Sequence, residues 1–200
     1  MWQSKDGDGW DAEFRAGKYE FLKKPTEQAR LDTIAAMIER SIDENGPCEV
    51  VDIGCGEGLL VSRLPEGVLR YVGVDISAVA LGRVHRDNVP VERVRTSLAE
   101  WNGAPAPIAR RVLVASEVLY YYRAAVDDLR RVVDATGTVS EIIVSCVAAH
   151  RDKPNWATAS KQLWADLAAT GWPEIQYERF VDPATGIAWD ITRYRIPAAG

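Results

Sequence analysis

The segment EVVDIGCGEGLL, residues 49–60, decides the fold of this chain. It begins with β-branched residues, which are typical of a buried parallel strand. An acidic residue follows, and glycine then occupies every second position through a bend, at Gly54, Gly56 and Gly58. Glycine at a strand-to-helix turn lets backbone N–H groups approach a ligand, because no Cβ stands in the way. The segment therefore predicts a site for a nucleotide-type cofactor.

The composition indicates one globular domain over residues 1–200, long enough to bury a core. A formal net charge of −5 argues against nucleic-acid and anionic-membrane partners, both of which select basic surfaces. No apolar run has the length of a membrane span and no signal-peptide core opens the chain, so we expect a cytoplasmic protein. The three cysteines form no CxxC pair, and we expect neither a metal site nor a disulfide framework.

Hydrophobic periodicity predicts alternating strands and helices along the rest of the chain. The expected strands are 49–53, 70–75, 91–95, 111–115 and 139–147, followed by a hairpin of 175–181 and 187–196. The first expected helix has Thr26 as its N-cap and ends at a stop signal in residues 45–47. Another begins at the cap Ser77 and ends just before Asn88, and the remaining three span residues 57–64, 124–135 and 157–170. Residues 96–109 read as a loop with one helical turn near 98–101. This alternation predicts a parallel sheet with right-handed crossovers and an antiparallel edge.

Residues 1–25 form an arm ahead of this core. The arm is polar and dotted with glycine, yet it carries several aromatic residues, which a disordered tail would usually lack. We expect an irregular or partly helical segment that packs onto the domain. It is either a lid over a site or a cover for a hydrophobic face.

An acidic residue closes the strand that follows the glycine loop. Asp75 lies about 20 residues beyond the loop, the spacing of a carboxylate that accepts hydrogen bonds from ribose hydroxyls. In an open α/β sheet, ligands bind beyond the carboxyl ends of the strands, where the loop and Asp75 would meet. The alternative is a tight turn with a solvent-facing Asp75.

Three motifs resemble those of the class I S-adenosylmethionine-dependent methyltransferases. VDIGCGEG (51–58) is similar to their motif I, VGVDIS (72–77) to their next motif, and ASEVLYY (115–121) to the strand 4 motif of small-molecule members. The resemblance runs from the helix at Thr26 through the terminal hairpin, which fits the family's reversed seventh strand. It implies an α/β, Rossmann-like fold: a mostly parallel seven-stranded sheet with an antiparallel C-terminal hairpin strand and helices on both faces.

The resemblance also places the methionine part of the cofactor. It implies that the glycine loop admits the cofactor to the backbone and that Asp52 lies near its amino group. Ser116 and Glu117 would border the methyl-donating end. The full set of expected cofactor-binding residues is Asp52, Gly54, Cys55, Gly56, Gly58, Asp75, Ile76, Ser97, Leu98, Ser116 and Glu117.

For the adenosine part, the resemblance assigns the ribose hydroxyls to Asp75 and the face of the adenine to Ile76. Family members often carry an acid after strand 3 that binds the adenine amino group, and Ser97 stands at the matching place here. We expect the Ser97 hydroxyl and the backbone N–H of Leu98 to take over those contacts.

On the acceptor side, the protein must align a nucleophile and remove a proton where needed, since the sulfonium already activates the methyl group. Of the two histidines, His85 is expected at the surface. His150 follows the strand 139–147 and is the candidate catalytic base, the alternative being a structural or substrate-contacting role. The expected substrate-binding residues are Tyr19, Tyr120, Tyr121 and Trp156, for which ordinary packing is the alternative.

Strand 4 is not followed by the Asn/Asp-Pro-Pro-Tyr type of sequence that marks relatives acting on planar amide or base nitrogens. This speaks against methylation of DNA, RNA or glutamine. The predicted function is methyl transfer from S-adenosylmethionine, with S-adenosylhomocysteine as product, to an oxygen or amine nitrogen of a soluble small molecule. The strand 4 motif is similar to nodulation-type amino-sugar N-methyltransferases and to natural-product enzymes, and O-methylation of a sugar or secondary metabolite is preferred. The alternatives are a protein methyltransferase and a non-catalytic module with the same fold.

Overall fold

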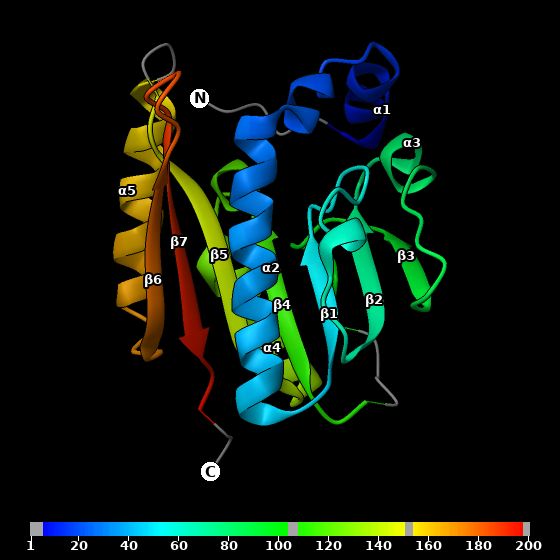
Figure 1. The fold of residues 1–200 in the computed structure, drawn as a ribbon, viewed down its shortest axis with the longest axis vertical. Coiled ribbons are helices and arrows are strands. Elements are labelled where there is room, and N and C mark those ends of the chain that lie inside the picture. The colour runs from blue at the N-terminus through cyan, green and yellow to red at the C-terminus, as the bar shows by residue number, and fades with distance from the viewer. Residues whose placement is uncertain (1–5, 104–107, 151–153, 198–200) are drawn as a thin grey trace.

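A computed structural model describes residues 6–103, 108–150 and 154–197 (Figure 1). Its centre is a seven-stranded sheet in the order β3-β2-β1-β4-β5-β7-β6. β7 runs antiparallel to both of its neighbours, and the other pairs are parallel. The strands are β1 (Cys48–Ile53), β2 (Val68–Asp75), β3 (Val91–Arg95), β4 (Arg111–Ser116), β5 (Val139–Ala149), β6 (Glu174–Val181) and β7 (Ala188–Arg195). The seven-stranded, mostly parallel sheet and its reversed hairpin strand are thereby confirmed.

Helices cover both faces of the sheet (Figure 1). The α-helices are α1 (Gly7–Arg15), α2 (Pro25–Asn45), α3 (Ala78–Leu81), α4 (Ala125–Thr136) and α5 (Pro154–Ala168). Short 3-10 helices form η1 (Glu20–Lys23), η2 (Val61–Arg63) and η3 (Leu119–Tyr121). In the described chain no helix is both long and apolar enough to cross a membrane.

Two hydrophobic cores lie between these layers. On one face, α2 packs its buried side against β1 and β4, with Ile34 and Ile38 fully buried. On the other face, α4 and α5 cover the sheet, with Leu129 and Leu167 fully buried. β1 is buried along its whole length, as expected of a central parallel strand.

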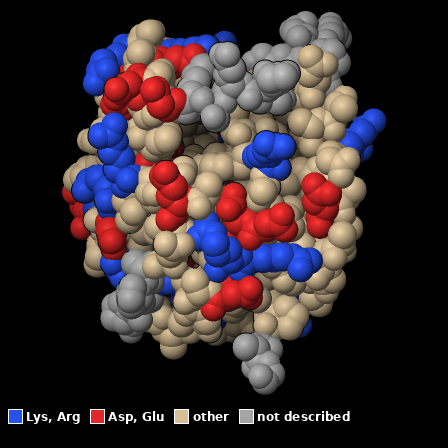
Figure 2. Space-filling view, turned by 180° about the vertical axis from the view of Figure 1, so that it is seen from behind, with Lys and Arg blue, Asp and Glu red and all other residues tan. Residues whose placement is uncertain are grey.

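Buried ion pairs occupy the end of the sheet where the parallel strands begin. Arg111 and Glu49 are both buried, with Nε and Oε1 2.5 Å apart. Arg193 pairs with Glu141 on β5 at 2.8 Å. Because breaking such a pair leaves a buried charge uncompensated, these contacts fix the register of the strands. At the surface, Figure 2 shows basic and acidic side chains interspersed over the rear face.

Three local predictions are corrected. Residues 57–64 form a turn and the short η2 rather than a helix, because Gly56 and Gly58 adopt left-handed φ angles of +54° and +74° that interrupt a helix. α2 begins at Pro25, with Lys24 in place of Thr26 as N-cap, since proline suits the first helical position.

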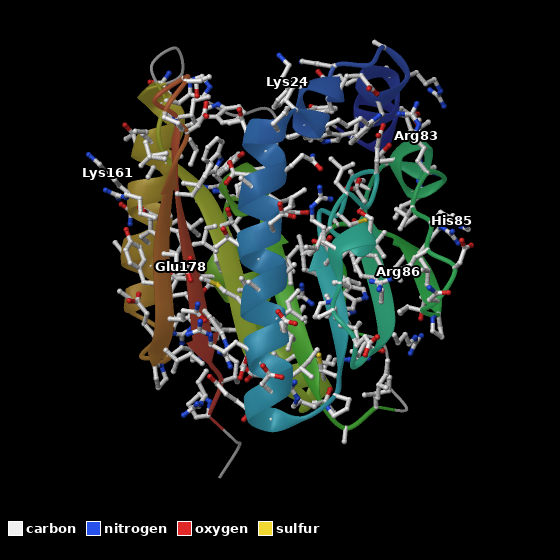
Figure 3. All side chains as sticks on the ribbon, viewed as in Figure 1. Lys24, Arg83, His85, Arg86, Lys161 and Glu178 are labelled. Carbon is white, nitrogen blue, oxygen red and sulfur yellow. The ribbon has the colours of Figure 1, made fainter. Side chains whose placement is uncertain are left out.

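The third correction concerns the helix after β2. Ser77 does cap α3, its Oγ accepting a hydrogen bond from the Ala80 N–H at 3.1 Å. The helix nevertheless ends at Leu81 instead of continuing towards Asn88, with Gly82 as its C-cap. His85 therefore lies beyond the helix with its side chain 73% exposed, pointing outward from the molecule, which confirms its expected surface position (Figure 3).

Candidate active site

A cavity of about 1290 Å³ opens at the carboxyl ends of β1, β2, β4 and β5. Its walls come from the glycine loop, from the segments after β2 and β4, from the first turn of α2, and from the N-terminal arm. Sites for a single small molecule usually measure ~300–1,000 Å³. The cavity therefore has room for two ligands side by side.

Most of the expected cofactor-binding residues meet in this cavity. Those that line it are Asp52, Gly54, Cys55, Gly56, Asp75, Ile76, Ser97, Ser116 and Glu117. Gly58 instead supports the loop from behind, because a Cβ at this position would lie 2.8 Å from Val84 Cγ1. The Leu98 side chain is buried, and its backbone N–H donates to the Tyr122 hydroxyl at 3.2 Å rather than into the cavity.

The glycine loop is held close to the sheet. The N–H groups of Gly54 and Cys55 both donate to the Val74 carbonyl on β2, at 2.7 and 3.2 Å. Gly54 has a φ of +67°, and a Cβ there would lie 2.2 Å from Val118 Cγ2. Only glycine fits this position, for reasons of backbone conformation and of space.

Asp75 joins the loop to the neighbouring strand. One carboxylate oxygen accepts the Gly56 N–H and the other accepts the Ser77 N–H, both at 2.8 Å. Burial nevertheless raises the pKa of Asp75, an effect that these two bonds partly oppose. A second acid lies deeper: the Tyr71 hydroxyl donates to Asp52 at 2.8 Å, and burial raises the pKa of Asp52 to about 7.

Glu117 is the first residue after β4 and has a strained backbone, with a φ of +58°. Its N–H donates to the Ser145 carbonyl at 2.9 Å. Its carboxylate accepts hydrogen bonds from the Tyr120 hydroxyl at 3.1 Å and the Ser145 hydroxyl at 3.4 Å. Burial raises the pKa of Glu117 to about 7, although the nearby Arg30 guanidinium opposes the change. Strain of this kind in a non-glycine residue is typical of functional sites.

Sequence reasoning missed two residues of this wall, Glu27 and Arg30. Arg30 is buried, donates through Nη2 to Glu27 at 3.0 Å, and reaches the Ser116 hydroxyl through Nη1. One signal was present in the sequence. Glu27 and Arg30 are three residues apart and lie on the same face of α2 as the apolar residues Leu31 and Ile34. Charges on a buried helix face are costly unless they serve a site or a partner.

The N-terminal arm forms the roof of the cavity, and Figure 1 shows α1 over this end of the sheet beside α3. Asp11 accepts hydrogen bonds from the Ser77 hydroxyl at 2.6 Å and the Val79 N–H at 3.1 Å. The buried Phe14 ring faces the glycine loop, 3.6 Å from where a Cβ of Gly56 would stand. The described part of the arm thus contributes side chains to the cavity wall.

The expected acceptor residues all line the cavity, and so does His150, which follows β5 directly. Their rings are in mutual contact: Tyr120 lies 4.8 Å from Tyr121 and 5.2 Å from Trp156, between ring centroids. Trp10 of the arm contacts Tyr121 edge-on at 5.2 Å, and Tyr19 lies 5.8 Å from Trp10. The aromatic wall therefore joins the arm, η3 and the start of α5.

The cavity is acidic. Among the described residues that line it, the carboxylates are Asp6, Glu27, Asp52, Glu57, Asp75, Glu100, Glu117 and Asp128, against the cations Lys18, Arg30 and Arg123. Within the described part of the chain, no three His, Cys, Asp or Glu side chains gather as a metal site would require. The arrangement suits ligands that carry positive charge.

Part of the chain matches a known protein family. Residues 50–137 match the model of the methyltransferase domain. Over this segment the chain is similar to methyltransferase domains, and its fold is that of the class I S-adenosylmethionine-dependent methyltransferases. No curated protein sequence matches it. The matched segment runs from β1 to the end of α4 and so contains both the glycine loop and the residues after β4.

Solved methyltransferases share the fold at low identity. The magnesium protoporphyrin IX methyltransferase of Synechocystis PCC 6803, with bound S-adenosylhomocysteine, has a TM-score of 0.70 and 16% identity over 96% of this chain and 100% of its own. The N-methyltransferase NodS of Bradyrhizobium japonicum WM9, in complex with S-adenosylhomocysteine, has a TM-score of 0.64 and 17% identity. The match covers 90% of this chain and 91% of NodS. The plantazolicin methyltransferase BpumL, also in complex with S-adenosylhomocysteine, has a TM-score of 0.66 and 12% identity. The match covers 94% of this chain and 91% of BpumL.

Proposed function

We propose that this chain transfers a methyl group from S-adenosylmethionine to an oxygen or amine nitrogen of a small molecule, in the metabolism of a sugar or a secondary metabolite. The observation that carries the proposal is the pair of hydrogen bonds by which Asp75 joins the glycine loop to the start of α3, inside a cavity with room for two ligands.

The residues present fit this cofactor. A glycine loop without side chains at Gly54 and Gly56 leaves the backbone open to it, and Asp75 offers a carboxylate to ribose hydroxyls. Asp52 lies deeper and would hold the cofactor's amino group, while Ile76 and Ser97 would contact the adenine. The cofactor supplies a methyl group already activated by its sulfonium.

The protein's remaining tasks are alignment, exclusion of water and removal of a proton. The aromatic wall and the arm close the cavity above the residues that follow β4, which favours a small acceptor over a folded protein surface. Two groups could take up a proton there: the imidazole of His150 and the carboxylate of Glu117.

Isothermal titration with S-adenosylmethionine and with S-adenosylhomocysteine tests the cofactor assignment. We expect saturable binding of both, and an absence of binding at millimolar ligand would contradict the proposal. Methyl-labelled cofactor incubated with separated low-molecular-mass and protein fractions of a cell extract then tests the acceptor class. Label should enter the small molecules, whereas label confined to protein would indicate a protein methyltransferase.

A further inference from the structure

The acceptor end of the cavity carries an excess of negative charge. Glu27 and Glu117 both face this region, and the guanidinium of Arg30 lies near both. Arg30 is already engaged by Glu27 and by the Ser116 hydroxyl. A bound acceptor therefore meets at least one carboxylate whose charge Arg30 does not balance, and a positive group on the acceptor would be stabilised there.

Glu117 is the carboxylate best placed to meet the acceptor. It follows β4 directly, is half-buried and opens onto the cavity. The Tyr120 and Ser145 hydroxyls hold its two oxygens, and its φ of +58° fixes the backbone that carries it. The group is thus oriented before any acceptor arrives, as a catalytic residue must be.

The aromatic wall beside Glu117 suits the same kind of acceptor. Tyr120 lies between Glu117 and Trp156: its hydroxyl donates to the carboxylate, and its ring lies 5.2 Å from the indole. Tyr121 lies on the other side of Tyr120, 4.8 Å away. Aromatic faces next to a carboxylate are typical surroundings of a bound ammonium group, through cation–π attraction.

We propose that the acceptor is an amine that enters the cavity as an ammonium ion, and that Glu117 is the catalytic residue that removes its proton. The inference rests on the proposed methyltransferase function and narrows its acceptor to nitrogen.

The proton transfer is balanced as follows. One N–H bond of the ammonium breaks, the proton joins a carboxylate oxygen of Glu117, and the electron pair stays on nitrogen. That pair then forms the N–CH₃ bond while the carbon–sulfur bond of the cofactor breaks and its electrons remain on sulfur. The product leaves as a methylated ammonium ion together with S-adenosylhomocysteine, and Glu117 returns its proton to solvent.

The same charges disfavour an oxygen acceptor. An alcohol or phenol develops negative charge on oxygen as its proton passes to Glu117, next to the remaining carboxylate of Glu27. Like charges at close range raise the energy of that state. An ammonium ion instead loses positive charge on deprotonation and leaves a neutral nucleophile, so no anion forms beside the carboxylates.

Tyramine provides a direct test, because it carries an amine and a phenol on one small aromatic frame. The protein is incubated with S-adenosylmethionine and tyramine, and fragmentation mass spectrometry locates the added methyl group. The paired probes 2-phenylethylamine and 4-ethylphenol are assayed alongside at millimolar concentration. We expect N-methyltyramine, and turnover of the amine probe above that of the phenol. Methyl on the phenol oxygen, or no methylated amine although titration shows cofactor binding, would overturn the inference alone, whereas failure of cofactor binding would instead overturn the proposed function.

A Glu117→Gln variant tests the assigned residue. We expect turnover of the amine to fall by about 10²–10⁴-fold, as for loss of a general base, with little change in the dissociation constant for S-adenosylhomocysteine. Glu66→Gln, an exposed carboxylate on the loop before β2, is the matched control and should keep its turnover. Retained turnover in Glu117→Gln would remove Glu117 from the mechanism.

A pH profile of the wild-type protein gives a readout that needs no variant. The groups that face Glu117 from neighbouring elements are Glu27, Arg30, Tyr120, Tyr121 and Cys146. Because the pKa of Glu117 is about 7, the rate should rise as pH increases through that value and then level off. A rate independent of pH between about 5.5 and 8.5 would contradict the assignment of Glu117 as base.

Discussion

The carboxylate of Asp11 accepts a hydrogen bond from the Ser77 hydroxyl at 2.6 Å, across 66 residues of chain. Ser77 is also the N-cap of α3 and lies two residues after Asp75. The arm is therefore attached to the same turn that presents the Asp75 carboxylate. These hydrogen bonds lower the pKa of Asp11, so the contact persists until the pH falls through that lowered value.

Replacing Asp11 with alanine should loosen the roof of the cavity. The Ser77 hydroxyl and the Val79 N–H each lose an acceptor, and α1 loses its attachment to α3. We expect faster proteolytic cleavage ahead of α2 and weaker binding of S-adenosylhomocysteine, measured by limited proteolysis and by titration. The control is Asp8→Ala, because the Asp8 side chain lies on the same helix and is 94% exposed. Identical proteolysis of the two variants would show that the Asp11 contact does not hold the arm.

Gly54→Ala should impair both folding and cofactor binding. The new Cβ would stand 2.2 Å from Val118 Cγ2 in a left-handed backbone conformation. Overpacking typically costs ~1–3 kcal/mol, and the left-handed conformation adds about 1–2 kcal/mol. Gly137, at the C-terminal end of α4, has a left-handed φ of +62° and nothing within 4 Å of an added Cβ, so Gly137→Ala isolates the backbone cost.

A double variant separates the two causes. Val118→Ala removes the two methyl groups but keeps the Cβ, which is 2.7 Å from the added atom, so Gly54→Ala with Val118→Ala should recover only part of the unfolding free energy that the clash removed. Urea denaturation measures this coupling between the two positions. Strictly additive losses would mean that Val118 does not confine the loop.

Asp75→Ala should weaken cofactor binding more than it weakens the fold. The variant removes a carboxylate that would accept charge-assisted hydrogen bonds from ribose, each worth ~1.5–3 kcal/mol. The expected rise in the dissociation constant for S-adenosylhomocysteine is about 10- to 100-fold. Asp75→Asn retains one oxygen for the Gly56 or Ser77 N–H and should lie between wild type and Asp75→Ala. Unchanged affinity in both variants would contradict the ribose assignment.

The strand pattern was readable from sequence because burial and periodicity agree there. β3 spans the residues expected of it, 91–95, and β1 starts one residue earlier than predicted. The glycine loop and Asp75 could also be predicted from the sequence, because each has a fixed position relative to the end of a strand. Such local signals decide strands and turns before any tertiary contact is known.

The corrected elements depend on tertiary contacts instead. Gly58 has a left-handed φ of +74°, and Val84 fills the space that a Cβ at this position would need, a contact that the local sequence does not show. Neither Glu27 nor Arg30 was named from the sequence, and only the packing of α2 over β4 brings Arg30 to Ser116. The Glu27–Arg30 pair at the acceptor end therefore came from the structure, whereas the glycine loop and Asp75 came from the sequence.

The free energy of unfolding should fall as pH rises from about 4 to above 7. Burial raises the pKa of both Asp52 and Glu117 to about 7, above ordinary values near 4. In this interval the folded state binds more protons than the unfolded state, so raising the pH favours unfolding. The slope is at most about 1.4 kcal/mol per pH unit for each group, and less for Glu117, which the cavity exposes to solvent.

Urea denaturation at about pH 5.5 and about pH 7.5 measures this effect on the ligand-free protein. Carboxyls whose pKa is lowered, such as Asp11 and Asp190, change protonation below this interval and do not contribute to it. Asp52→Asn should flatten the dependence while keeping an acceptor for the Tyr71 hydroxyl. Greater stability at the higher pH would show that the two carboxyls are not buried as described.

His150 and Glu117 compete for the role of base, and His150→Gln distinguishes them. His150 lines the cavity at the carboxyl end of β5, whereas Glu117 is fixed by the Tyr120 and Ser145 hydroxyls. If Glu117 removes the proton, His150→Gln should lose only a hydrogen bond to the acceptor, a fall of about 3- to 10-fold in kcat/KM with most of it in KM. The rise in rate through pH 7 should persist in this variant and vanish in Glu117→Gln. A fall in kcat of about 10²-fold or more in His150→Gln, together with loss of the pH dependence, would show that His150 is the catalytic base, as predicted from the sequence.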